Sequence, residues 1–194
     1  SLDPRSLALM RILVGSGFVV CRLINLPWVR EFYTDQGSYP RVSAVWLPVL
    51  FPGFPGFGGS LFNAVGVDVG VFFLYFLTIL AGVAVALGYK TRMATLICWV
   101  LGLSLYNRCP IINPASDMFV LLCMFFGFFL PWGDMWSLDN PRGSLAEAQP
   151  YRSAATLGWR IQVCALYITA ALSKTSVHWG NGTASLIAMK SDAW

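Results

Sequence analysis

The residues whose types and spacing could support chemistry centre on Lys174, within the apolar stretch LYITAALSKTSVHW at Leu166–Trp179. A lysine ammonium at the depth of lipid tails costs about 2.5–3.5 kcal/mol on insertion scales. We therefore expect Lys174 to face a cavity, a partner or the headgroups. Three roles are open to it: snorkelling from a helix end, a buried ion pair, or a catalytic base whose pKa is lowered by burial.

Two more polar residues share a helical face with Lys174, because Arg160, Tyr167 and Lys174 recur every seven residues. We expect such a stripe to avoid lipid. It is either a polar seam between packed helices or one wall of a ligand cavity. In the second case Arg160 and Tyr167 bind the ligand on which Lys174 acts. A quinone or another lipid is the natural ligand for a membrane site of this kind.

Arg108 and Asp117 are the other candidates for a binding role. They flank a turn that contains Pro110 and Pro114, and this turn could bring them together as an ion pair across two helix ends. The pair would then be either a structural clamp or part of the ligand site. Asp117 also begins an apolar run, where a carboxylate suits the helix dipole and can cap free amides.

Helices within a membrane must position these residues. Of 194 residues, 57% are hydrophobic and 11% are charged, whereas soluble domains carry roughly 25% charged residues. The pattern predicts an all-α, polytopic integral membrane bundle in the cell membrane, with about five spans plus interfacial helices. The expected spans are Ser6–Leu26, Val69–Leu87, Met93–Tyr106, Met118–Trp132 and Ala154–Ser173.

Between the first two spans, Val42–Phe51 could form a short helix at the interface, and the run PGFPGFGG at Pro52–Gly59 cannot be a regular helix. Within the first span, Arg11 and Arg22 lie about three helical turns apart and so share one face. That face meets protein, water or headgroups. In the simplest interpretation each arginine snorkels from its own end of the span.

Several classes of function are excluded. The net charge of +4 comes without a run of consecutive basic residues, so nucleic acid is not an expected partner. One histidine and five scattered cysteines give no metal-ligand spacing, and we expect no metal site. No catalytic triad, phosphate loop or paired-carboxylate motif is present. The lipid bilayer is the expected partner.

Six strings taken in order resemble the HTTM family, the membrane domain shared with vitamin K-dependent gamma-carboxylase. They are LALMRILVG (Leu7–Gly15), FYTDQGSYPR (Phe32–Arg41), GYKTR (Gly88–Arg92), SLYNRCPIINPASD (Ser104–Asp117), LPWGDMWSLD (Leu130–Asp139) and the lysine segment through WGNGTA (Leu166–Ala184). The resemblance implies a polytopic helical domain. It also implies that Lys174, five residues before Trp179, matches the base that deprotonates vitamin K hydroquinone.

The resemblance further implies, as partners, other membrane subunits or a thiol–disulfide oxidoreductase. Carboxylases carry a histidine in the region that matches Asn113–Asp117, and this chain has none there. The large extracytoplasmic domain that follows the membrane part in carboxylases is also missing, so carboxylation of protein glutamates is not expected. We expect residues 1–194 to form a single HTTM-like transmembrane domain that is truncated at the C-terminus.

Two hypotheses follow, and they leave open whether the protein is an enzyme. In the first, the protein is carboxylase-like and binds a quinone-type lipid, such as vitamin K hydroquinone, with Lys174 as base and Arg160, Tyr167, Arg108 and Asp117 as binding residues. In the second, the same fold is a non-catalytic membrane scaffold subunit of a larger complex.

Overall fold

The computed structural model describes residues 2–42, 59–109, 112, 115–141, 151–175 and 177–191. Every regular element in these ranges is a helix, and the one β contact there is an isolated bridge between Leu2 and Tyr151. The predicted all-α fold is therefore confirmed. The chain divides into two compact units, Ser1–Arg152 and Ser153–Trp194, and each is described by itself.

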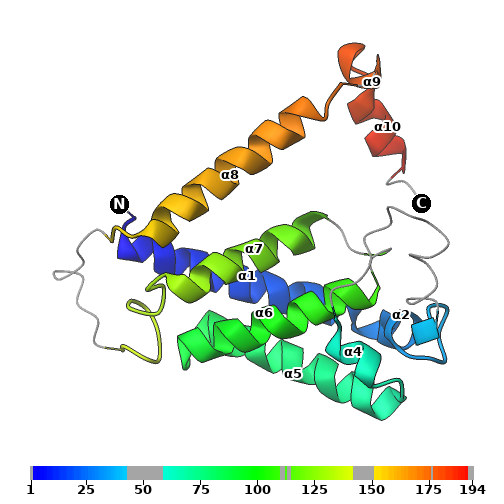
Figure 1. The fold of residues 1–194 in the computed structure, drawn as a ribbon, viewed down its shortest axis with the longest axis horizontal. Coiled ribbons are helices and arrows are strands. Elements are labelled where there is room, and N and C mark those ends of the chain that lie inside the picture. The colour runs from blue at the N-terminus through cyan, green and yellow to red at the C-terminus, as the bar shows by residue number, and fades with distance from the viewer. Residues whose placement is uncertain are drawn as a thin grey trace. The chain divides into compact units, whose positions relative to one another are not determined.

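Unit 1 is built on four long helices, which lie side by side in Figure 1. They are α1 (Pro4–Asn25), α5 (Asp68–Leu87), α6 (Thr91–Arg108) and α7 (Ala115–Phe129). Helix α1 packs on α5, α5 on α6 and α6 on α7, while α7 also contacts α1 and closes the bundle. Each predicted span in this unit corresponds to one of these helices, with ends that differ by less than one turn.

Three described segments are long and apolar enough to cross a membrane, namely Pro4–Tyr33, Asp68–Leu87 and Ala154–Leu172. The first continues α1 through the 3-10 turn η1 (Leu26–Trp28) into α2 (Val29–Tyr33). Helix α7 is apolar but shorter. The protein is thus a helical membrane protein. The predicted interfacial helix at Val42–Phe51 and the run at Pro52–Gly59 lie, apart from their outermost residues, outside the described residues.

Local sequence sets the ends of these helices. The Asp3 side chain accepts a hydrogen bond of 2.8 Å from the amide of Arg5, and Pro4 occupies the first helical position of α1. Gly88 ends α5 with a φ of 71°, a left-handed conformation in which glycine carries no steric penalty. The short helix α4 (Leu61–Ala64) begins at Ser60, whose side chain accepts from the amide of Phe62.

Helices α1 and α5 come into backbone contact at Gly15. A Cβ built on Gly15 would lie 2.7 Å from the amide nitrogen of Ala86 and 2.9 Å from its Cα. No larger residue fits there unless the helices move apart. Small residues commonly allow such close approach between membrane helices, where packing replaces the hydrophobic effect as the driving force.

Arg11 ties together the end of the bundle at which α5 stops and α6 starts. Its side chain is fully buried. The guanidinium donates to five backbone carbonyls: Val85 (3.0 Å), Ala86 (2.8 Å), Trp132 (3.0 Å), Met135 (3.4 Å) and Trp136 (2.5 Å). Two of these carbonyls, those of Val85 and Ala86, belong to the last turn of α5, where the helical hydrogen-bond pattern ends. Since Arg22 is also only 4% exposed, the shared face of the two arginines meets protein, and the snorkelling interpretation is wrong.

Asp139 caps the first turn of α6 at the same end. Its carboxylate accepts from the amides of Lys90 and Thr91, each at 2.7 Å, and from the Thr91 hydroxyl at 2.6 Å. Slight burial alone raises the pKa of Asp139. These hydrogen bonds and the charge of Arg11 outweigh that effect, so the pKa lies below its ordinary value.

Unit 2 contains α8 (Ala154–Leu172), α9 (Val177–Gly180) and α10 (Ala184–Ser191). Helix α8 begins with a capping box, in which the Ser153 side chain accepts from the amide of Thr156 and the Thr156 side chain accepts from the amide of Ser153. It corresponds to the predicted fifth span.

Candidate functional site

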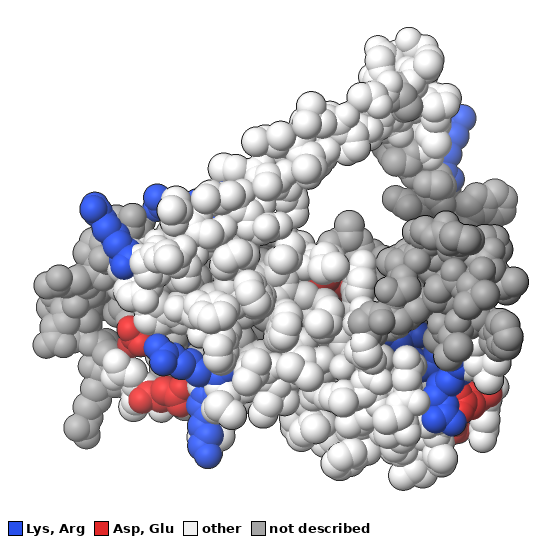
Figure 2. All heavy atoms as spheres, in the orientation of Figure 1, with Lys and Arg blue, Asp and Glu red and all other residues white. Residues whose placement is uncertain are grey.

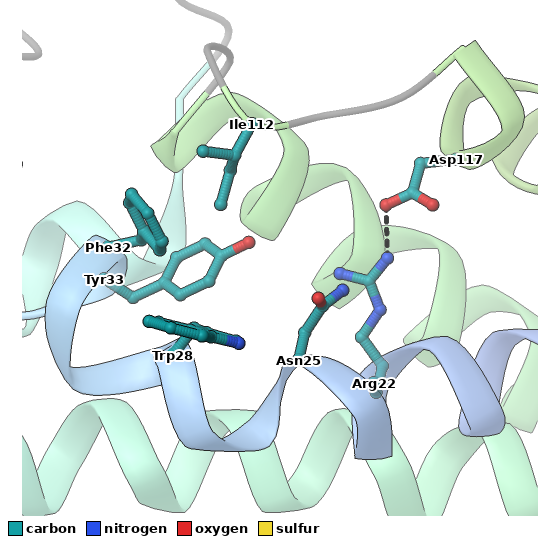
Figure 3. Close-up of a pocket in the computed structure, with 7 residues that line it drawn as sticks. All are labelled: Arg22, Asn25, Trp28, Phe32, Tyr33, Ile112 and Asp117. Carbon is teal, nitrogen blue, oxygen red and sulfur yellow. Dashed lines mark hydrogen bonds and ion pairs between the residues drawn. The ribbon is translucent and has the colours of Figure 1, made fainter. Parts of the chain in front are cut away.

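A pocket of about 290 Å³ opens at the opposite end of unit 1 from Arg11, and Figure 3 draws the residues around it. They come from the end of α1, from η1 and α2, from residue 112 and from the first turn of α7. The lining residues are Arg22, Asn25, Trp28, Phe32, Tyr33, Ile112 and Asp117. One side of the pocket is aromatic and the other is charged.

The charged side is an ion pair between Arg22 and Asp117. The side chain of Arg22 is 5% exposed and that of Asp117 is 14% exposed, so both charges are largely shielded from solvent. Arg22 lies in the last turn of α1 and Asp117 in the first turn of α7. Each charge has the sign that its helix dipole favours at that position.

The chain around Arg22 holds its guanidinium in place. The Tyr75 hydroxyl donates to the Arg22 carbonyl at 2.7 Å, and the guanidinium carbon lies 5.1 Å from the centroid of the Phe18 ring. Its Nε is buried and has no hydrogen-bond partner among the described residues. A buried donor without a partner is uncommon in folded proteins.

The aromatic side consists of Trp28, Phe32 and Tyr33. Tyr33 is 3% exposed, and its ring packs at 6.2 Å, centroid to centroid, from both Phe62 and Tyr75. In Figure 3 the Tyr33 hydroxyl points away from Phe32 into the space between Ile112 and Asn25. A flat ligand in the pocket would therefore lie against aromatic rings on one side and reach polar groups on the other.

Arg108 lies in a neighbouring polar cluster and does not line this pocket. Its side chain is fully buried, 3.8 Å from Asp35 Oδ1, and its guanidinium carbon lies 5.8 Å from the centroid of the Tyr39 ring. None of its three nitrogens has a hydrogen-bond partner in the described part of the chain. The predicted ion pair between Arg108 and Asp117 is wrong, because α1 supplies the partner of Asp117.

Asp35 is shared between two arginines. Arg41 donates to its Oδ2 at 2.7 Å, while Arg108 makes only the longer contact. Partial burial alone raises the pKa of Asp35. The hydrogen bonds and charge of Arg41, together with the charge of Arg108, hold the pKa below its ordinary value. Burial likewise raises the pKa of the Tyr39 phenol.

The remaining predicted site residues lie in unit 2. Arg160 and Tyr167 are exposed side chains on α8, and the exposed fraction of Tyr167 is 70%. Lys174 is exposed just beyond the helix, and its Nζ lies 4.7 Å from the centroid of the Trp179 ring, a cation–π contact. The catalytic role of Lys174 and the binding roles of Arg160, Tyr167, Arg108 and Asp117 stay predictions.

The sequence interpretation missed most of the pocket. It treated Arg22 as a snorkelling side chain and gave no binding role to Asn25, Trp28, Phe32 or Tyr33. One available signal was the spacing of Arg11 and Arg22, because two arginines on one face of a span need protein partners. The described residues contain no cluster of three or more histidine, cysteine or acidic side chains that could hold a metal ion.

The model of the HTTM domain matches residues 1–193, which is nearly the whole chain. No curated protein and no solved structure matches the chain.

Proposed function

Because the chain belongs to the HTTM family, we propose that it is a multi-pass protein of the cell membrane that binds a quinone-type lipid. The ring of the quinone enters the pocket beside Trp28, Phe32 and Tyr33, and its oxygens reach the polar end formed by Arg22 and Asp117. The observation that supports this most directly is the joining of an aromatic wall to a shielded ion pair in one pocket.

The size and chemistry of the pocket suit this ligand. Its volume of about 290 Å³ lies just below the range of about 300–1,000 Å³ that is typical of small-molecule sites, so it takes a ring rather than a whole lipid. Arg22, Asn25 and Asp117 supply the polar groups of the lining. A quinone carbonyl could accept from the Arg22 guanidinium or from the Asn25 amide, and a hydroquinone hydroxyl could donate to the second oxygen of Asp117.

Binding of a short-chain naphthoquinone to the full chain in detergent micelles tests the proposal. Equilibrium dialysis with detection of the quinone by its ultraviolet absorbance gives the affinity. Tyr33→Phe should weaken binding about fivefold by removing the hydroxyl that points into the pocket (Figure 3) and can donate to a quinone oxygen. Trp28→Ala should weaken it more by removing a stacking face. The matched controls are Tyr89→Phe and Phe73→Ala, exposed residues that do not line the pocket.

Equal affinity of the Tyr33 and Trp28 variants and of their controls would contradict the proposal. Absence of binding in the unaltered chain, together with stable co-purification of other membrane subunits, would favour the scaffold hypothesis instead. Mass spectrometry of lipids that co-purify with the chain provides a second readout, since a bound quinone would be seen directly.

We also propose, independently of the pocket in unit 1, that Lys174 acts as a base on a reduced quinone-type lipid. It rests on the apolar segment around Lys174 and on the resemblance of that segment to the carboxylase base. Lys174→Ala should abolish turnover of the reduced quinone-type lipid, because the base that deprotonates it is lost. Binding of the quinone to the pocket of unit 1 should be unchanged. Lys190→Ala, a second exposed lysine of unit 2, is the control. Conversion that survives Lys174→Ala would rule out this role without affecting the binding proposal.

A further inference from the structure

The second large cavity lies at the Arg11 end of unit 1 and has no part in the proposed function. Its volume is about 600 Å³, and it is formed by the start of α6 and the segment that follows α7. The charged residues around it are Lys90, Arg92, Asp134 and Asp139. Figure 2 shows side chains of both signs next to one another at this end of the unit.

The four charges do not cancel one another in pairs. The Asp139 carboxylate already accepts three hydrogen bonds from the start of α6. Lys90, Arg92 and Asp134 make no ion pair within 4.0 Å to any described residue. The cavity therefore presents two cations and one carboxylate whose charges remain available to a ligand.

A buried tryptophan also borders the cavity. Trp132 lines it and is fully buried. Its indole ring packs so closely on α7 that a Cβ on Gly127 would lie 2.3 Å from the ring. Trp132 therefore forms a fixed wall of the cavity.

The walls of the cavity are held in place independently of any ligand. Arg11 binds the carbonyl of Trp132 at 3.0 Å and that of Trp136 at 2.5 Å. Gly133 packs so closely on the start of α6 that a Cβ there would lie 2.7 Å from the Thr91 hydroxyl. Such preorganisation lowers the entropic cost of binding.

We propose that this cavity binds a phosphodiester that also carries a primary ammonium, the headgroup chemistry of phosphatidylethanolamine. The phosphate lies against Lys90 and Arg92, and the ammonium donates to Asp134. The cavity lies just beyond the C-terminal ends of the apolar helices α5 and α7. In a membrane, the end of an apolar helix lies at the level of the lipid headgroups. A purely anionic headgroup would leave Asp134 facing negative charge, and a methylated ammonium could not donate a hydrogen bond to it.

The test uses the full chain in micelles, titrated in turn with short-chain phosphatidylethanolamine, phosphatidylcholine and phosphatidylglycerol and followed by thermal unfolding. Phosphatidylethanolamine should bind about fivefold more tightly than the other two, the effect of about one partly exposed charged contact. Asp134→Asn should remove this preference, whereas Lys90→Gln and Arg92→Gln should weaken all three lipids alike. Glu31→Gln and Arg5→Gln are the controls, because neither residue lines the cavity.

Soluble glycerophosphoethanolamine, titrated in the same way, distinguishes a free phosphodiester from a lipid. Tighter binding of the lipid identifies a membrane headgroup as the ligand, while equal binding identifies the soluble ester. Binding of phosphatidylglycerol as tight as that of phosphatidylethanolamine, or a preference that persists in Asp134→Asn, would overturn the proposal. Because Tyr33→Phe affects only the other pocket, failure here and failure of the quinone proposal are separate results.

Discussion

Arg22 in the last turn of α1 donates to Asp117 in the first turn of α7, two residues that lie 95 positions apart in the sequence. Both side chains are shielded from solvent, and the pair joins the first and last helices of the bundle at one end. Breaking it leaves a shielded charge without its partner, which is costly in a way that breaking an exposed pair is not.

Arg22→Met is therefore expected to lower the free energy of unfolding by about 3–5 kcal/mol. The exposed pair between Arg30 and Asp68, whose side chains are 65% and 25% exposed, provides the comparison. Arg30→Gln should cost less than about 1 kcal/mol. Unfolding by denaturant in micelles measures both. Equal losses for the two variants would show that the Arg22 pair contributes no more than a surface contact.

Replacement of Arg11 should be among the most damaging single changes in unit 1. Arg11→Lys keeps the charge but loses the planar arrangement of donors that reaches five carbonyls, so we expect a loss of about 3 kcal/mol or more. Arg5→Gln, on the same helix and exposed, should be nearly neutral. The shift in thermal unfolding of each variant checks the prediction. A lysine variant as stable as the unaltered chain would contradict a clamping role.

The contact at Gly15 gives a paired prediction within α1. Gly15→Ala places a Cβ 2.7 Å from the backbone of Ala86 and should destabilise the bundle. Gly17→Ala meets nothing within 4 Å and should cause no loss, since alanine is the better helix former by about 1 kcal/mol. Opposite signs of the two stability changes would confirm the close approach. A neutral Gly15→Ala would mean that the helices separate at no cost.

Stability should depend on pH through Asp139. The pKa of Asp139 is lower in the folded chain than in the unfolded chain. Its ionised carboxylate therefore stabilises the folded state at pH values above the ordinary pKa of about 3.9. That contribution is lost as pH falls from about 4 through the lowered value. Asp139→Asn should cost about 1 kcal/mol at pH 7, as the loss of a helix cap does.

Unfolding measured from pH 7 to pH 3 tests this effect. The Asp139→Asn variant should lose less stability on acidification than the unaltered chain does. Some acid sensitivity should remain in the variant because the pKa of Asp35 is lowered as well. Parallel pH profiles of the two chains would show that Asp139 carries no such contribution.

The sequence predicted the helices well because their signals are local. Runs such as Val69–Leu87 are apolar, and helices begin or end at caps such as Asp3, which starts α1, and Gly88, which ends α5. The face shared by Arg11 and Arg22 follows from helical periodicity alone. These features need no knowledge of which helix packs on which.

The partners of the charged residues were not predictable in the same way. Asp117 has an arginine nine residues before it, and only the packing of α7 on α1 decides that Arg22 is its partner instead. Likewise, Trp28 and Tyr33 carry no sequence signal that separates a pocket wall from an interfacial belt. The pocket is formed where residues of α1, η1 and α2 come together with residue 112 and the first turn of α7, and this is a tertiary effect.

Helix α1 is attached to its neighbours at two positions along its axis, by Arg11 towards one end of the bundle and by Arg22 towards the other. A shift of this helix along its axis by a single residue, about 1.5 Å, would break both attachments together. Piston-like motion of α1 is therefore blocked. Opening of either pocket by sliding of α1 would break both attachments, whereas rearrangement of the connecting segments at a pocket's rim would leave them in place.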